Sequence, residues 1–226
     1  MEFTSDQSKR VWHIVCFGIL YLGSFFLVEN RVTKINIIHT TIDDYIPFCE
    51  YFIIPYVLWY AFVGVTVLYF VLINKNDKEY YPLVISLAIG MIVFLIVSYM
   101  YPNGQNLRPY LDGSNIFERI VQLLYRIDTS TNILPSLHVF NAVVCCVAWC
   151  RHDRCKKHKF VLWSMIVLTV LICLSTMFLK QHSFVDVVTA LILNGCCYHM
   201  FYHRNLVTFV KHCKEKWAWK KSGIFR

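Results

Sequence analysis

The sequence predicts an all-α integral membrane protein, a six-helix bundle with a short interfacial helix in an outer-side loop region. Of its 226 residues, 57% are hydrophobic and only 16% are charged, which is too apolar for an ordinary soluble domain. The apolar residues form six runs of about 17 to 23 residues, each long enough for a helix to cross the hydrocarbon core. The rest of the chain is too short for a separate soluble domain, so residues 1–226 are predicted to form one membrane-embedded domain.

Six helices are expected from these runs. They are Val11–Val28, Tyr51–Ile73, Pro82–Met100, Leu134–Cys150, Phe160–Leu179 and Phe184–Tyr202. Five runs contain no Asp, Glu, Lys or Arg, and the sixth contains only Asp186. The first run is followed by no small-residue cleavage site, so we expect a retained helix and not a signal peptide.

The orientation of the bundle follows from lysine and arginine in the loops. With the N-terminus inside, 16 of the 22 basic residues lie on the inner side, seven of them in the tail from residue 203 to 226. We therefore predict a multi-pass protein of the cell membrane with both termini in the cytoplasm. The net charge of +8 is explained by this asymmetry, and without an aromatic-basic reader motif a nucleic-acid partner is not expected.

Two long loops are predicted on the outer side of the membrane. The loop from Asn30 to Glu50 contains Asp43 and Asp44, whose carboxylates could bind a metal but are expected to be solvated. In the loop from Tyr101 to Ile133, the segment Asn115–Arg126 has an apolar stripe and is predicted to be a short helix at the membrane interface.

Polar residues of complementary chemistry are predicted to meet on the outer side. They are Arg108, Ser136, His138, Lys180, His182 and Asp186. Because the fourth and sixth helices both begin there, their first residues should lie at one depth. His182 and Asp186 are four residues apart, so on a helix the carboxylate could hold the imidazole. A first-turn proline at 135 would leave the amides of the fourth helix free to face an anion.

Three short motifs resemble the signatures of the type 2 phosphatidic-acid phosphatase superfamily. They are Arg108-Pro109, Pro135-Ser136-Leu137-His138 and Ser175-x6-His182-x3-Asp186, against the usual K-x6-R-P, P-S-G-H and S-R-x5-H-x3-D. With leucine in the glycine position, the P-S-L-H motif resembles that of a branch of the superfamily that includes inositol phosphorylceramide synthases and bacterial relatives.

The chain departs from the superfamily pattern at three positions. Tyr101 replaces the motif lysine, Leu137 the glycine and Thr176 the arginine, so two phosphate-binding cations are absent. Lys180 is expected to replace one of them, and Arg119 or Arg126 could supply the other.

The resemblance implies a metal-independent lipid phosphatase without a cofactor, and assigns roles to the motif residues. His182 would be the nucleophile, oriented by Asp186, and His138 the acid and base. The phosphate would be bound by Arg108, Ser136, Leu137 and Ser175, with Lys180 as the expected replacement for a motif cation. The absence of a CxxC pair among the ten cysteines is consistent with a site that lacks zinc.

The expected reaction is hydrolysis of a lipid phosphate monoester or diphosphate at the outer leaflet, through a phosphohistidine. Two alternatives stay open. One is transfer of a phospho-headgroup to an alcohol through the same intermediate. The other is a lipid-binding membrane protein without catalysis. The identity of the lipid and the oligomeric state are not predicted.

Overall fold

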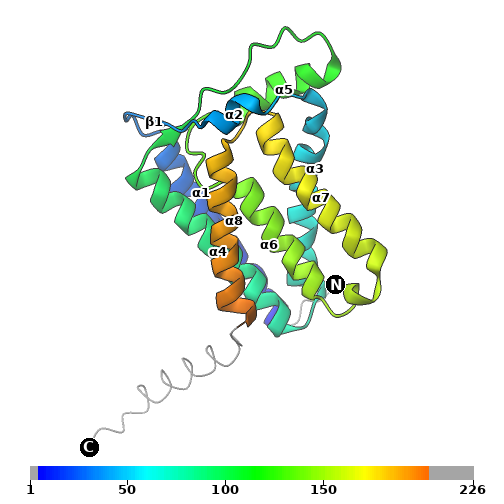
Figure 1. The fold of residues 1–226 in the computed structure, drawn as a ribbon. Helices are drawn as coiled ribbons and strands as arrows, with labels where there is room; N and C mark the ends of the chain where they lie inside the picture. Colours follow the sequence, from blue (N-terminus) through cyan, green and yellow to red (C-terminus); the bar gives the residue numbers. More distant parts are fainter. Residues whose placement is uncertain (1–4, 204–226) are drawn as a thin grey trace, which may run out of the picture.

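The structure, a computed structural model, describes residues 5–203 of the chain and the side chains of residues 7–202. The predicted basic tail therefore lies outside the described residues, apart from its first position. Nearly all regular structure is helical, and the helices form one bundle (Figure 1). The prediction of an all-α membrane bundle is confirmed.

The elements follow one another in the order that the hydropathy predicts. They are α1 (Ser5–Glu29), β1 (Asn36–Ile37), α2 (Thr41–Tyr45), η1 (Glu50–Phe52), α3 (Ile53–Leu68), η2 (Tyr69–Ile73), α4 (Asp77–Met100), β2 (Asn103–Gly104), α5 (Ile116–Ile127), α6 (Leu137–Arg151), η3 (Cys155–Lys157), α7 (Lys159–Phe178), α8 (Phe184–Tyr198) and η4 (His199–His203). The two-residue strands β1 and β2 pair in parallel.

Five of the described helical segments are long and apolar enough to span a membrane, which makes this a multi-pass membrane protein. The fourth predicted helix, α6, has only 15 residues, or about 22 Å of rise. The prediction that it begins at Leu134 is wrong. Ser136 is its N-cap, accepting a hydrogen bond from the Val139 amide, so Pro135 lies before the helix instead of in its first turn.

Helix α6 is short because it is the centre of the bundle and is covered on several sides. It packs against α3, α4, α7 and α8, and Val139, Phe140 and Cys145 on it have no exposed surface. Its contact with α4 is so close that a Cβ atom at Gly90 would lie 2.0 Å from the Phe140 ring. A buried helix does not need a long lipid-facing surface, since its neighbours provide that surface.

The predicted interfacial helix is present as α5 and lies with α2 across one end of the bundle (Figure 1). Val121 on it is completely buried beside Tyr56 and Leu179, whereas Ile116, Leu123 and Ile127 are exposed. The opposite end of the bundle is held by polar contacts. Arg10 bonds to Asp77 at 2.5 Å, and His152 bonds to Glu79 at 2.6 Å. The end carrying α5 also carries the candidate site.

Candidate active site

The site is built on the two helix starts that the sequence singled out. Helices α6 and α8 begin side by side, and the Ser136 amide donates to the Asp186 main-chain oxygen at 3.2 Å. Ser183 is the N-cap of α8 and forms a capping box with Asp186, whose Oδ2 accepts from the Ser183 amide at 2.8 Å. Such reciprocal bonds satisfy amides that a helix start leaves without partners. Both starts are thereby fixed relative to each other.

The capping box also sets the geometry of His182. His182 Nδ1 lies 3.4 Å from Asp186 Oδ2, and the carboxylate has no exposed surface. The two residues are close, as the spacing indicated, although His182 lies before the first turn of α8 and not on its face. Asp186 Oδ1 has no hydrogen-bond partner among the described residues. A carboxylate on Nδ1 leaves His182 Nε2 as the nitrogen that can react.

His138 lies opposite His182, and the two ring centroids are 5.8 Å apart. The imidazole packs against Tyr56 and Trp59 at centroid distances of 4.6 and 4.4 Å. Its Nε2 is buried and has no partner within the described part of the chain. An unpaired buried nitrogen costs free energy, which is consistent with a place kept for a ligand.

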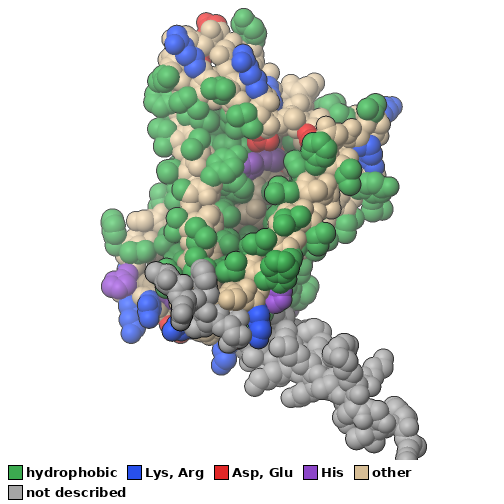
Figure 2. All heavy atoms as spheres, turned by 180° about the vertical axis from the view of Figure 1, so that it is seen from behind, with side chains coloured by type: hydrophobic (Ala, Val, Ile, Leu, Met, Phe, Trp, Pro, Cys, Tyr) green, Lys and Arg blue, Asp and Glu red, His purple; other side chains and the backbone are tan. Residues whose placement is uncertain are grey.

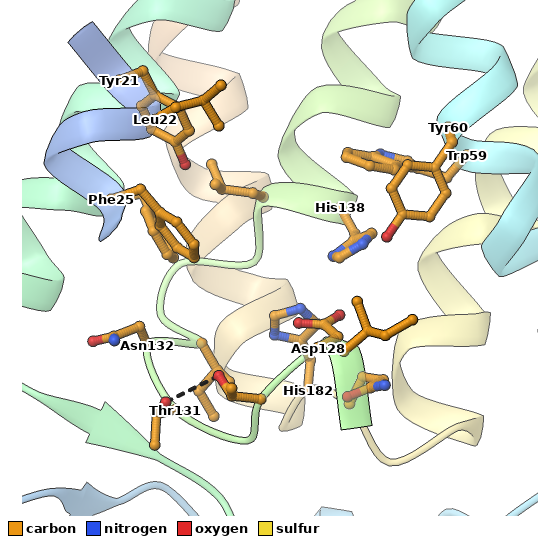
Figure 3. A pocket seen from close by; sticks show the side chains of 16 residues that line it. Tyr21, Leu22, Phe25, Trp59, Tyr60, Asp128, Thr131, Asn132, His138 and His182 are labelled. Atoms are coloured by element: carbon orange, nitrogen blue, oxygen red, sulfur yellow. Dashed lines mark hydrogen bonds between the residues drawn. The ribbon is translucent and has the colours of Figure 1, made fainter. Parts of the chain in front are cut away.

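Both histidines line one cavity of about 400 Å³, which is open on one side of the bundle. Figure 2 shows purple histidine side chains inside a hollow, with red acidic side chains at its edge and green hydrophobic side chains around it. Figure 3 shows the residues that line it, with His138 and His182 facing the same space. Helix α1 contributes Tyr21, Leu22 and Phe25, α3 contributes Trp59 and Tyr60, and the segment between α5 and α6 contributes residues from Ile127 to Ile133. The cavity therefore has an apolar side and a polar end.

Arg108 lies beside this cavity but does not line it. Its guanidinium donates to the main-chain oxygens of Tyr125, Asp128 and Thr129 and, at 2.5 Å, to Gln181 Oε1. Burial lowers the pKa of the Arg108 guanidinium, although arginine stays charged in proteins. Arg108 thus holds the C-terminal end of α5 and reaches the site through Gln181.

Lys180 is directed away from the histidines. Its ammonium donates to the main-chain oxygens of Asp43 and Ile46 at 2.7 and 2.5 Å, and it does not line the cavity. Its φ of 51° is unusual for a residue with a side chain. The structure therefore does not bring Lys180 together with His138 and His182. Arg119, which donates to the Gly113 main-chain oxygen, and Arg126 also lie outside the cavity lining.

The remaining predicted phosphate-binding residues differ in their positions. Leu137 lines the cavity, and its amide lies in the first turn of α6, where helix geometry leaves N–H groups without intrahelical acceptors. Ser136 is fully buried as the cap of α6. Ser175 is fully buried as well, and its hydroxyl donates to the Ile172 main-chain oxygen at 2.7 Å. Neither serine hydroxyl lies on the cavity wall.

Asp43, which was expected to be solvated, is buried instead. It is 2% exposed and accepts hydrogen bonds at 2.7 Å from the Ser183 hydroxyl and the Phe184 amide. Burial disfavours its charged form, but the bonds from Ser183, Phe184 and Thr40 outweigh burial and lower the pKa of Asp43. The expectation was wrong because the negative charge faces the positive end of α8. Asp44 is exposed and pairs with His39, as expected for a loop acid.

Two cavity residues were not singled out from the sequence. Gln181 is 2% exposed, and its Nε2 has no partner among residues 7–202. Asp128 follows α5 and accepts a hydrogen bond from the Tyr56 hydroxyl at 2.6 Å. Gln181 immediately precedes His182, and that adjacency was the only signal available. Within the described residues, no group of three or more His, Cys, Asp or Glu side chains is arranged to hold a metal ion.

Comparison with known families found one match. Residues 103–207 match the model of the PAP2 superfamily. The predicted resemblance to this superfamily is thus confirmed. The matched segment contains β2, α5, α6, α7 and α8, and with them Arg108 and the pairs His138–His182 and His182–Asp186. Comparisons with curated proteins and with solved structures found no match. The PAP2 match supports an activity of the phosphatase or phosphotransferase type.

Proposed function

We propose that this PAP2 protein cleaves a phosphate ester of a membrane lipid at the outer leaflet through a phosphohistidine intermediate. One observation carries the proposal. Two histidines face one cavity with ring centroids 5.8 Å apart, and only His182 has a carboxylate on Nδ1. A phosphoryl group between the rings would have a nucleophile on one side and a proton donor on the other.

In the first half-reaction, His182 Nε2 attacks phosphorus and forms the N–P bond. The P–O bond to the lipid alcohol breaks, and His138 donates a proton to the leaving oxygen. Asp186 stabilises the positive charge that develops on the His182 ring and keeps the proton on Nδ1. In the second half-reaction, His138 takes a proton from water or an alcohol, which attacks phosphorus and releases His182.

In this proposal Gln181 binds the phosphate in place of the cations that the superfamily pattern has and this chain lacks. Its Nε2 is buried without a described partner, and Arg108 fixes the amide by bonding to Oε1. The guanidinium polarises this amide, so its charge acts on the phosphate through one intervening group. The first-turn amides of Leu137 and His138 add donors at the positive end of α6. Lys180 is assigned to anchoring the loop of Asp43 and Ile46, with no direct phosphate contact.

Two features support a lipid substrate and the outer side. The cavity side formed by Tyr21, Leu22 and Phe25 is apolar, which suits acyl chains. Among residues 7–202, the segments at the site end carry six Lys and Arg residues and those at the far end carry nine, an asymmetry that favours an outer-side site. Transfer of a phospho-headgroup to an alcohol is the second candidate function. It uses the same residues, and the apolar wall could hold a lipid alcohol beside the intermediate.

The test is a panel of lipid phosphates presented to the purified protein in nanodiscs, with free phosphate and new lipid products measured together. Wild-type protein should consume at least one lipid, and His182→Ala should consume none. Free phosphate or a free phospho-headgroup as product identifies hydrolysis, and a new phospholipid identifies transfer. Equal consumption by wild type and His182→Ala would contradict the proposal. Binding of every lipid without consumption would favour a lipid-binding protein without catalysis.

A further inference from the structure

The charges around the cavity do not suit a doubly charged phosphate. Asp128 is the only Asp, Glu, Lys or Arg side chain among the described residues that line the cavity. A second acid, Glu29, lies directly behind the wall and bonds to Thr129, Thr131 and Asn132, all three of which line it. A phosphate monoester carries almost two negative charges at neutral pH. Two carboxylates near a site without a lining cation would repel it.

The Asp128 carboxylate is available to a ligand. The Tyr56 hydroxyl, at 2.6 Å, is its one described hydrogen-bond partner. Arg108 bonds to the Asp128 main-chain oxygen at 2.7 Å, and its guanidinium attracts the carboxylate without bonding to it. Asp128 lines the polar end of the cavity together with the two histidines (Figure 3). Tyr56 connects it to the catalytic pair, because the same side chain packs its ring on His138 at 4.6 Å.

Aromatic rings border the same space. Trp59 and Tyr60 line the cavity with Asp128, and their rings meet edge to face at a centroid distance of 4.8 Å. Aromatic faces attract cations, and the attraction is strongest where water is excluded. A carboxylate with aromatic rings beside it suits an ammonium group. The Asp128 carboxylate and these rings line the same cavity as Gln181, the proposed phosphate-binding residue.

We propose that Asp128, Trp59 and Tyr60 form a subsite for the ammonium group of a zwitterionic phosphodiester lipid headgroup, of the phosphocholine or phosphoethanolamine class. This inference rests on the proposed function and names its substrate class. The phosphate of such a lipid carries one negative charge, which neutral donors such as Gln181 can bind. His182 attack then breaks the bond from phosphorus to the glycerol oxygen, which receives the proton of His138. The phospho-headgroup stays on His182 until water or a lipid alcohol accepts it.

The test compares dihexanoyl phosphatidylcholine with dihexanoyl phosphatidylglycerol, a diester of the same chain length without an ammonium group. The kcat/KM for the choline lipid should exceed that for the glycerol lipid by about tenfold, the size of one desolvated cation contact. Asp128→Asn should bring this ratio close to one. Trp59→Leu should lower it as well, whereas Trp59→Phe, which keeps an aromatic face, should retain most of it.

Asp112→Asn is the matched control, because it removes a carboxylate from an outer-side loop away from the cavity. Its ratio should equal that of wild type. Equal ratios for wild type, Asp128→Asn and Asp112→Asn would overturn the subsite. So would a preference of wild-type protein for dihexanoyl phosphatidate over both diesters.

A binding experiment separates failure of the subsite from failure of the proposed function. Titration calorimetry with His182→Ala measures lipid binding without catalysis, because this variant should not turn over the lipids. Dihexanoyl phosphatidylcholine should bind about tenfold more tightly than dihexanoyl phosphatidylglycerol, and adding Asp128→Asn should remove the difference. If wild-type protein turns over no lipid but this difference is present, the chemistry fails and the subsite stands. If turnover is found without this difference, the subsite fails and the chemistry stands.

Discussion

Replacing Lys180 by alanine distinguishes an anchoring role from a phosphate-binding role. The sequence pattern predicts that the ammonium contacts phosphate, so its loss should lower kcat by about 10²–10³. In the structure the ammonium donates to the Asp43 and Ile46 main-chain oxygens at 2.7 and 2.5 Å. Hydrogen bonds to a charged group contribute about 1.5–3 kcal/mol each. The residue is partly exposed, so we expect Lys180→Ala to lower the free energy of unfolding by roughly 2–4 kcal/mol in total.

The backbone of Lys180 allows the contribution of the side chain to be separated. Its φ of 51° costs a residue with a Cβ about 1–2 kcal/mol, and glycine avoids this cost. Lys180→Gly should therefore be more stable than Lys180→Ala by about that amount, while both lack the ammonium. Lys180→Arg keeps a charged donor and serves as the conservative control.

The assay measures thermal unfolding and lipid turnover on the same nanodisc preparations. Both truncated variants should unfold at lower temperature, and at a temperature where they are folded their kcat should stay within a few-fold of wild type. An unchanged unfolding temperature together with a kcat lowered 10²–10³-fold would refute the anchoring role. That result would return Lys180 to the phosphate site.

Three further predictions follow from neighbouring residues. Hydrogen bonds lower the pKa of Asp43. The charged Asp43 therefore stabilises the fold fully above the unfolded pKa of about 3.9, and this stabilisation is lost as the pH falls through the lower folded pKa. Asp43→Asn should flatten the dependence of the unfolding temperature on pH below about 4, and an unchanged curve would contradict this. Gln181→Met should lower kcat by about 10²–10³ with little change in unfolding temperature, because it removes one transition-state donor, and full activity would exclude that role. In a Cys49→Ser background, Tyr110→Cys should react with an impermeant thiol reagent added outside intact cells and Lys157→Cys should not, whereas the reverse pattern would put the site in the cytoplasm.

The fold could be predicted because membrane solvation acts on whole segments. A run of some 20 apolar residues is enough to identify a membrane helix. The predicted runs agree with α1, α3, α4, α7 and α8 to within a few residues, apart from the polar starts of α1 and α4 and the end of α3, where η2 continues the helix. The start of α6 was misplaced because the apolar run continues through Leu134 and Pro135, while the helix starts only after the Ser136 cap. Hydropathy indicates where a segment is buried but not where its helical hydrogen bonds begin.

The proximity of His138, His182 and Asp186 could be predicted because all three belong to two short motifs at the starts of two helices. The directions of the Arg108 and Lys180 side chains could not, since both bond mainly to main-chain oxygens. Every residue has such an oxygen, so no sequence pattern marks which of them will receive a cation. Gln181 and Asp128 were missed for a related reason, because their importance comes from a cavity formed by segments far apart in the chain.

Mapping the phosphorylated residue tests the central claim most directly. Wild-type protein is given a lipid labelled on phosphorus, quenched rapidly in base and digested, and the labelled peptide is sequenced. We predict a base-stable, acid-labile label on His182, with no label in His182→Ala. Its appearance at wild-type level in His182→Ala, or on a different residue of wild-type protein, would contradict a mechanism in which His182 is the nucleophile.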